Sequence, residues 1–430
     1  MTTAPEPRPA PPLPLVTARE MQAWDRRAIE SHQSPEPVLM EAAGRAAAHV
    51  LHALYPEGRV VAAVGRGNNG GDALVLLRSL RAWGREVVAI PVGDAAVTPA
   101  LLHGWELPVA APGEAEAAFR DAAVLVDGIL GTGATGAPRE PQAAAIRAMH
   151  AARRPILALD GPTGVDLTRG SVEGEAVRAE VTVTFGAPKR GLLLHPGRGH
   201  AGRIIVVETG FPPLRGEEVA AGVITPAWAR GRGVKLPSDS HKGTAGRLIV
   251  LAGRPAMGGA AILCGHAALR SGVGIVRIVS SGLNRIPVQT VLPEALFVDR
   301  DEGDLVEVAE SARAIVAGPG MGTDDGARAA LRTLLEAASC PVLLDADALT
   351  LLAADSSLAP DGAAKRYLLT PHPGEMSRLL GKEVDEITAD PFAAVEEARD
   401  RFGCAVLLKG APTLVAAPGE PTLANVTGHS

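Results

Sequence analysis

A segment rich in glycine, amide and carboxylate side chains, VGRGNNGGDALVLL at residues 64–77, has residue types that suit chemistry. Its Gly65, Gly67 and Gly70 have the G-x-G-x-x-G spacing, between an apolar run typical of a strand and a stretch typical of a helix. Such a loop lets the backbone approach a phosphate and directs helix N-terminal amides toward it, although the same glycines can serve only a tight turn. Both interpretations are open at this point.

Two observations weaken the interpretation as a cofactor loop. A dinucleotide-binding fold places an acidic residue roughly 20 positions after the glycines, whereas Asp94 lies 29 residues after Gly65 (94 − 65). The glycine spacing also recurs in GTGATG, residues 131–136, as expected by chance in a glycine-rich chain. The motif alone therefore does not establish a bound NAD cofactor.

The polar residues near these glycines are more informative. Asn68, Asn69 and Asp72 lie in one loop, Asp127 ends the apolar run AAVLVD, and Asp160 ends PILALD. Ligands of parallel α/β sheets bind where the strands end, so these side chains are expected to converge. Oxygen donors without His or Cys suit a hard cation or a polyhydroxylated substrate. A purely structural role of Asp127 and Asp160 in caps or turns is the alternative.

Hydrophobic patterning places these residues on an alternating α/β scaffold. Thr17 and Glu20 have the spacing of a capping box, which predicts a helix, and residues 37–54 predict a second one. Apolar runs typical of buried parallel strands follow at residues 59–64, 86–92, 122–129, 155–160, 181–185 and 203–208. The alternation predicts a layered α/β domain.

The strand pattern lapses over residues 211–241, where Pro, Gly and charged residues accumulate, and this predicts a domain boundary. A second alternating series follows, without sequence repetition of the first. Its strand-like segments are residues 246–253, 274–280, 312–320, 340–345, 366–370 and 405–416, and its clearest helices are residues 258–272 and 325–338. We therefore expect two α/β domains, as the length of 430 residues also suggests.

Composition excludes several classes of protein. The net charge of −6 offers no overall attraction for a polyanion, so no nucleic-acid partner is expected. No secretory signal pattern and no apolar run of membrane-spanning length occur, so neither a membrane nor export is expected. Cys264, Cys340 and Cys404 are widely spaced in apolar surroundings, which predicts buried free thiols and a cytoplasmic location.

Five segments together carry a family resemblance: VLMEAAG, GRGNNGGDAL, LVDGILGTGATG, LALDGPTGVD and VTVTFGAPKRGLLLHPGRGHAG. Their order and spacing resemble those of NAD(P)H-hydrate epimerases, the N-terminal module of bifunctional nicotinamide-nucleotide repair enzymes. The resemblance spans residues 15–212 and implies a Rossmann-like three-layer α/β/α domain. The resemblance implies that the domain binds hydrated NADH and hydrated NADPH as small-molecule substrates, and does not hold an intact dinucleotide as a cofactor.

The resemblance also implies roles for individual positions. Asp160 is the implied catalytic acid/base and contacts the substrate. The implied substrate-binding residues are Asn68, Asn69, Gly70, Gly71, Asp72, Gly131, Thr132, Gly133, Ala134, Thr135, Gly136, Ala137 and Asp160. Asn69, Asp127 and Thr163 match the potassium positions, where Thr163 replaces the commoner Ser but keeps a hydroxyl.

The implied reaction suits these groups. A hydrated nicotinamide carries a hydroxyl at ring carbon 6, beside the ring nitrogen. Inversion of this centre requires proton transfer while the carbon–oxygen bond breaks and re-forms. A positioned carboxylate can carry the proton, and a cation can order the loops or the substrate.

Residues 225–430 resemble the ADP-dependent NAD(P)H-hydrate dehydratase module, which has a ribokinase-like α/β fold. The resemblance is carried by SDSHKGTAGRLIVLAG, GGAAILCGHAALRSGVGIVRI, AGPGMG, LLDADAL, LLTPHPGEMSRLLG and AVLLKGAPTLV. It implies a hydrate site at Ala260, Gly320 and His372 and an ADP segment at Lys409, Gly410, Ala411, Pro412 and Thr413. ADP is the implied phosphoryl donor, with magnesium. From the residues alone, a plain loop histidine is as good an interpretation of His372 as a ligand-binding one, and a solvated lysine at a strand end is as good an interpretation of Lys409.

We expect residues 1–14 to form a disordered tail and residues 213–224 a linker. After NVTG the dehydratase family continues into a G-x-G-D turn that opens a helix, whereas this sequence continues only to Gly428, His429 and Ser430. The ribokinase-like domain is therefore expected to be incomplete, and dehydration by this 430-residue chain to be impaired. The epimerase module carries all its motifs.

Two other classes of function are weighed against nicotinamide-nucleotide repair. A small-molecule kinase shares the ribokinase-like fold, but fold alone does not carry function, and TPHPGE favours the dehydratase. A non-catalytic binding module is disfavoured by the presence of Asn69, Asp127 and Asp160. The sequence leaves homo-oligomerisation open.

Overall fold

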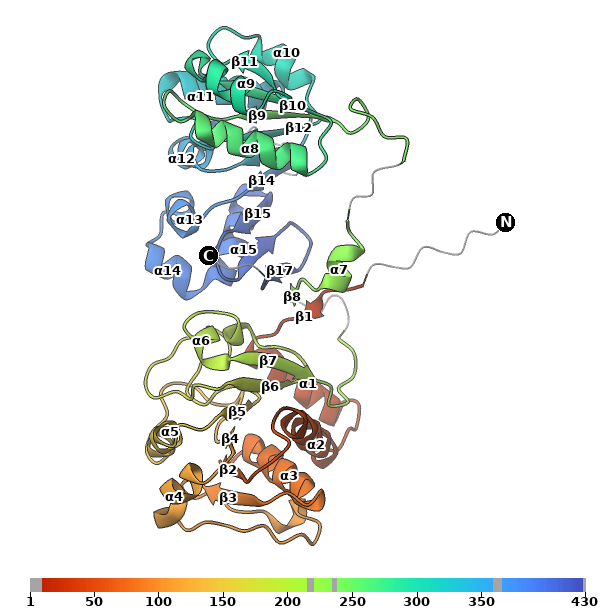
Figure 1. Cartoon of the computed structure of the whole chain (residues 1–430), viewed down its shortest axis with the longest axis vertical. Helices are drawn as coiled ribbons and strands as arrows, with labels where there is room; N and C mark the ends of the chain where they lie inside the picture. Colours follow the sequence, from red (N-terminus) through yellow and green to blue (C-terminus); the bar gives the residue numbers. More distant parts are fainter. Residues whose placement is uncertain (1–9, 215–219, 234–237, 359–365, 428–430) are drawn as a thin grey trace, which may run out of the picture. The chain divides into compact units, whose positions relative to one another are not determined.

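The computed structural model describes residues 10–214, 220–233, 238–358 and 366–427. The chain forms two compact units, Pro12–Val223 and Ile224–Thr427 (Figure 1). Most of the expected tail, residues 215–219 of the expected linker and the final residues 428–430 lie outside the described residues.

The first unit is built on a parallel sheet with the strand order β3–β2–β4–β5–β6–β7. Its strands are β1 (Leu13–Pro14), β2 (Val60–Val64), β3 (Val87–Pro91), β4 (Val124–Gly128), β5 (Ile156–Leu159), β6 (Val181–Phe185), β7 (Arg203–Val207) and β8 (Ala221–Val223). Its α-helices are α1 (Ala18–Glu30), α2 (Glu36–Leu54), α3 (Asn68–Ala82), α4 (Ala115–Arg120), α5 (Gln142–Ala151) and α6 (Arg198–Ala201). The short strands β1 and β8 pair antiparallel.

Helices cover both faces of this sheet, as the alternation of side chains along a strand requires. Val60, Ala62 and Val64 of β2 pack into one apolar cluster with α2 and α3. Val61 and Ala63 pack into the opposite cluster with α4 and α5. Figure 1 shows α2 and α3 on one side of the strands and α4 and α5 on the other. The first unit is the predicted three-layer α/β/α domain.

Local signals at the first helix are confirmed. The Thr17 hydroxyl accepts a hydrogen bond from the Glu20 amide at 3.1 Å, and the Glu20 carboxylate accepts one from the Thr17 amide at 2.6 Å. This capping box begins α1, whose Met21 and Trp24 are buried. Because Trp24 packs on Phe211, α1 is fixed against the segment that follows β7.

The second unit is also α/β, and its strands follow the order β17–β16–β15–β14–β13–β12–β9–β10–β11. Its strands are β9 (Arg247–Leu251), β10 (Ile275–Ser280), β11 (Leu296–Asp299), β12 (Ala314–Ala317), β13 (Val342–Leu344), β14 (Tyr367–Leu369), β15 (Ala405–Leu408), β16 (Thr413–Ala416) and β17 (Thr422–Asn425). Its α-helices are α7 (Pro226–Arg230), α8 (Gly258–Arg270), α9 (Arg285–Val291), α10 (Leu305–Glu310), α11 (Asp325–Ala337), α12 (Asp347–Ala354), α13 (Pro373–Leu380), α14 (Val384–Ala389) and α15 (Pro391–Phe402).

Strands β9 to β15 of the second unit pair in parallel, whereas β15, β16 and β17 form antiparallel pairs. Helices α8 and α9 pack on β9 and β10 through a cluster that includes Val250, Ile278 and Val288. Cys340 and Cys404 are buried free thiols as expected, but Cys264 on α8 is only partly buried, so the expectation is wrong for this thiol. Among the described helices, none is long and apolar enough to span a membrane.

Candidate functional sites

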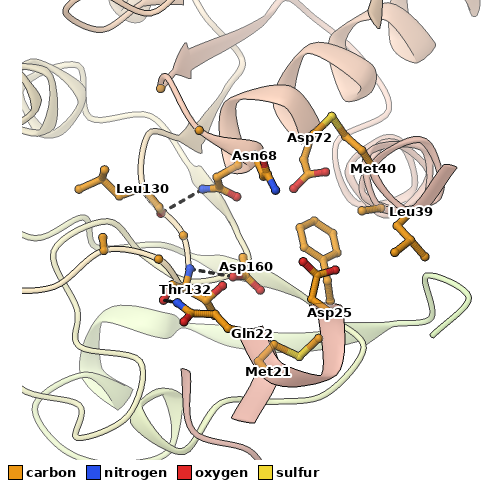
Figure 2. A pocket seen from close by; sticks show the side chains of 18 of the residues that line it. Met21, Gln22, Asp25, Leu39, Met40, Asn68, Asp72, Leu130, Thr132 and Asp160 are labelled. Carbon is orange, nitrogen blue, oxygen red and sulfur yellow. Dashed lines mark hydrogen bonds between the residues drawn. The ribbon is translucent and has the colours of Figure 1, made fainter. Parts of the chain in front are cut away.

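A cavity of about 500 Å³ lies within the first unit, at the edge of the sheet where the strands end (Figure 2). This volume is in the range of small-molecule sites. The β2–α3 loop and the loop after β4 form one wall, and α1 and α2 form another. Eight of the residues predicted to bind substrate line it: Asn68, Asn69, Asp72, Gly131, Thr132, Gly133, Ala134 and Asp160.

Asp160 stands directly after β5 in a backbone conformation that L-residues rarely adopt, with φ of +64°. Such a conformation costs about 1–3 kcal/mol at a non-glycine residue and persists only where the surroundings enforce it. The Asp160 amide donates to Val183 O at 2.7 Å, and the Asp160 carboxylate accepts from the Thr132 amide at 3.1 Å. The strained turn thus aims the carboxylate into the cavity and ties it to the opposite loop.

Lys189 is fully buried beside Asp160, and its ammonium forms an ion pair with the Asp160 carboxylate. The same ammonium donates to Thr184 Oγ1 at 2.9 Å and to Phe185 O at 3.1 Å. A lysine ammonium has three donors and no acceptor, so these three bonds saturate it. Lys189 therefore fixes the position of Asp160 and stabilises its negative charge, and has no donor left for a ligand.

Asp72 presents a second carboxylate to the cavity from α3. The residue is 8% exposed, and no hydrogen bond or ion pair to its carboxyl occurs within the described part of the chain. Burial raises the pKa of Asp72 well above its ordinary value, the negative charges of Asp160 and Asp25 raise it further, and Lys189 lowers it. Burial likewise raises the pKa of Asp25 on α1, with added effects of Glu36 and Asp160.

The three predicted potassium positions are linked by hydrogen bonds, since Asn69 and Thr163 both bond the backbone of Leu130 and Thr163 also bonds Asp127. Thr163 donates from its amide to Asp127 at 2.8 Å and from its hydroxyl to the same carboxylate at 2.7 Å. The Asn69 side-chain amide donates to Leu130 O at 3.0 Å, while its own Oδ1 is buried and has no hydrogen-bond partner within the part of the chain that the structure describes. Burial raises the pKa of Asp127 to about 6, although the bonds from Thr163 and Ile129 oppose this shift. An unpartnered amide oxygen, a carboxylate and a hydroxyl are all hard oxygen donors.

Gly65 of the β2–α3 loop and Gly70 of α3 have packing roles. A Cβ at Gly65 would lie 1.9 Å from Ile129 O, and a Cβ at Gly70 would lie 1.9 Å from Gly65 O. Asp94 pairs with exposed Arg66 at 3.0 Å, so it is engaged at the surface. Gly70, Gly71, Thr135, Gly136 and Ala137 were predicted to bind substrate but are not among the residues that line the cavity.

In the second unit, two predicted substrate residues lie next to each other. A Cβ at Gly320 would lie 3.1 Å from the Cβ of Ala260, where α8 begins beside the loop that follows β12. Gly320 has φ of +60°. The sequence segments GGAA and GPG therefore meet, as the resemblance to a dehydratase implies.

His372 and Lys409 meet through Glu375. The His372 ring accepts from the amides of Gly374 and Glu375 at 3.0 and 3.3 Å, which caps α13. Lys409, which follows β15, lies 2.7 Å from Asp345 and 3.6 Å from Glu375. His372 thus caps α13 whether or not it also contacts a ligand, and Lys409 is paired with two carboxylates.

Comparison with known proteins agrees with this division of the chain. Residues 36–191 match the family model described as YjeF-related protein N-terminus, and residues 248–430 match that of NAD(P)H-hydrate dehydratase. The bifunctional NAD(P)H-hydrate repair enzyme of Coxiella burnetii is 35% identical over 413 residues, covering 93% of this chain and 83% of the relative. That of Escherichia coli is 35% identical over 390 residues, covering 88% and 74%.

This chain belongs to the family of bifunctional NAD(P)H-hydrate repair enzymes. The family combines an epimerase and an ADP-dependent dehydratase that act on small-molecule substrates, which confirms the expected function and disfavours the kinase and the non-catalytic module. Among solved structures, the ADP/ATP-dependent NAD(P)H-hydrate dehydratase of Bacillus subtilis, co-crystallised with ATP and Mg²⁺, is 33% identical, with a TM-score of 0.38. It covers 45% of this chain, which covers 69% of it.

Several residues of the two sites were not predicted from the sequence. In the first unit they are Lys189, Asp25, Thr209 and Gln22. The buried Thr209 hydroxyl has no hydrogen-bond partner in the described ranges, and the Gln22 side chain donates to Thr132 O at 2.9 Å. In the second unit they are Asp345 and Glu375. One signal was available, because Lys189 is the only lysine among residues 12–223 and follows an apolar strand.

Proposed function

We propose that the cavity of the first unit is the epimerase site and that Asp160 carries its essential carboxylate. The observation that carries the proposal is the strained φ of Asp160, with its side chain fixed between Lys189 and the Thr132 amide. A carboxylate fixed at a cavity wall can accept a proton and can stabilise positive charge on a nicotinamide ring. The apolar side chains of Met21, Leu39 and Phe185 offer a surface for the ring.

The phosphates of the substrate fit the mouth of the cavity. The N-terminus of α3, at Gly67 and Asn68, lines the cavity, and helix N-termini favour anions. Arg66 lies in the same loop and is exposed, so it can approach a phosphate. This end of the cavity is suited to the pyrophosphate, and the carboxylate-lined interior to the hydrated ring.

Asn69, Asp127 and Thr163 are the proposed potassium ligands. The unpartnered Oδ1 of Asn69 fits a cation, since a buried acceptor without a donor is costly. A bound cation would hold the loops after β2 and β4 in place. The test compares epimerase rates in KCl and in tetramethylammonium chloride of equal ionic strength. We expect potassium stimulation in the native chain and its loss in Asn69→Leu; equal rates of the native chain in both salts would contradict the assignment.

The test of the epimerase site starts from the pure R hydrate of NADPH and follows the S epimer by chromatography. The native chain should interconvert the epimers far faster than buffer does, and Asp160→Asn should not. Asp121→Asn is the control, because Asp121 is exposed at the end of α4. Unchanged interconversion by Asp160→Asn would overturn the role of Asp160.

For the second unit we propose a hydrate site at Ala260, Gly320 and His372 and an ADP segment at Lys409–Thr413, with magnesium at the phosphates. The contact of Gly320 with Ala260 supports the hydrate grouping, and Glu375, which pairs with both His372 and Lys409, links that grouping to the ADP segment. Phosphoryl transfer to the ring hydroxyl, followed by loss of phosphate, completes the dehydration. ADP binding, measured by calorimetry in the presence of Mg²⁺, should weaken in Lys409→Met; unchanged affinity would contradict the assignment.

A further inference from the structure

The cavity of the first unit holds two carboxylates in opposite circumstances. Asp160 is ion-paired with Lys189 and accepts from the Thr132 amide. Asp72 is as deeply buried, but no donor of the described chain reaches its carboxyl. Figure 2 shows Asp72 and Asp160 directed toward the cavity from different walls, one from α3 and one from the end of β5. Pairs of carboxylates whose surroundings differ in this way commonly divide acid and base roles.

We propose that Asp72 is the proton donor to the departing hydroxyl at ring carbon 6, and that Asp160 accepts the proton of the water that returns on the opposite face. The inference rests on the proposed epimerase function of this cavity. It assigns to Asp72 a catalytic role, beyond contact with the substrate.

The first step breaks the carbon–oxygen bond. The proton of the neutral Asp72 carboxyl passes to the hydroxyl oxygen, and water leaves with the electron pair of the bond. The lone pair of the ring nitrogen forms a double bond to carbon 6, which gives a cationic ring. No oxidant or reductant is required.

The second step adds water to the other face. A lone pair of the water oxygen attacks carbon 6, its proton passes to Asp160, and the electron pair of the double bond returns to the ring nitrogen. The centre is inverted, one water has been exchanged, and one proton has moved from Asp72 to Asp160. The reverse reaction starts from this second protonation state.

The charges around the cavity favour this route. Asp25 from α1, Glu36 from α2 and Asp160 face the same space as Asp72, and the basic groups that line it are Lys189 and Arg66. This excess of negative charge stabilises a cationic ring. It also favours the protonated form of Asp72, since burial and the charges of Asp160 and Asp25 raise the pKa of this carboxyl.

The experiment measures epimerisation in ¹⁸O-labelled water. The native chain should place one ¹⁸O at carbon 6 for each inversion, because the original oxygen leaves as water. Inversion without ¹⁸O uptake would overturn the inference, since it would mean that the ring opens at the carbon–nitrogen bond. If the native chain does not interconvert the epimers, the proposed function itself fails, which is a separate outcome.

Asp72→Asn should lower kcat by about 10²- to 10⁴-fold, the usual contribution of a general acid, with KM nearly unchanged. The native profile should lose activity at high pH as Asp72 ionises, and Asp25→Asn should shift this loss to lower pH, because the Asp25 charge no longer raises the pKa of Asp72. Asp121→Asn is the control for the substitution itself. Native kcat in Asp72→Asn, or an unshifted pH profile in Asp25→Asn, would overturn the inference.

Discussion

Replacement of Lys189 by methionine tests whether the buried ion pair organises the first unit. The variant keeps the apolar stem of the side chain but removes the ammonium from a fully buried position. The Asp160 side chain is only 11% exposed, and its carboxylate would then lack its counter-charge. Breaking a buried pair in this way costs about 3–5 kcal/mol. We expect about 3 kcal/mol, the lower end of the range, because the Thr132 amide still donates to Asp160.

The assay follows thermal unfolding of the first unit by tryptophan fluorescence. In a Trp228→Phe background the remaining tryptophans, Trp24, Trp83 and Trp105, all belong to this unit. A loss of about 3 kcal/mol corresponds to a fall in Tm of about 6–12 °C for a unit of this size. Epimerase activity should fall with it, because Asp160 is no longer held in place.

Two further variants test whether the Lys189–Asp160 ion pair organises the first unit. Arg147→Met removes an exposed ion pair with Glu140, which water screens, so the stability should change little. The double variant Lys189→Met, Asp160→Asn removes the unpaired charge and should be more stable than Lys189→Met alone. If Lys189→Met unfolds at the same temperature as Arg147→Met, or if Asp160→Asn gives no recovery, the ion pair does not organise the unit.

Three other expectations follow from the same structure. Asp72→Asn should gain stability relative to the native chain as pH rises above 3.8. In the native chain the stabilising effect of a neutral Asp72 is fully present below that value, and it is lost as pH rises through the raised pKa of the folded state. Urea unfolding from pH 5 to pH 9 checks this expectation, and a stability difference that stays constant with pH would contradict it. Thr209→Val should raise KM about fivefold, the value of one hydrogen bond of about 1 kcal/mol, without loss of stability, because the Thr209 hydroxyl has no hydrogen-bond partner among the described residues. An unchanged KM would show that the hydroxyl does not contact the substrate. Gly65→Ala should destabilise the first unit by about 1–3 kcal/mol, since its Cβ would meet Ile129 O; native stability in chemical unfolding would show that the loop shifts freely.

The scaffold of the first unit could be predicted because its elements have strong local signals. The Thr17–Glu20 capping box predicted α1, and continuous apolar runs predicted β2, β4 and β5 to within about two residues at each end, the usual scatter of element boundaries. Parallel strands end at one edge of a sheet, so Asp160 and the β2–α3 loop could be expected together. The family resemblance then supplied roles that spacing alone left open.

The rest depends on tertiary contacts that have no local signature. Lys189 lies 29 residues after Asp160, and only the turn after β6 brings its ammonium to that carboxylate. Asp25 reaches the cavity because Trp24 packs α1 against Phe211. The segment after β4 was predicted as one continuous motif, but only Gly131, Thr132, Gly133 and Ala134 of it line the cavity, so substrate contact of the residues after Ala134 stays a prediction. In the second unit, Glu375 lies in the first turn of the helix that His372 caps, and there it pairs with both His372 and Lys409.

The proposed role of the Asp160 carboxylate in the first unit is the inversion of hydrated nicotinamide. The most direct measurement mixes the pure R hydrate of NADPH with the native chain or with Asp160→Asn, without ADP, and records both epimers over time. We expect rapid approach to the equilibrium ratio with the native chain and only the buffer rate with Asp160→Asn. Equal rates for the two proteins would contradict it.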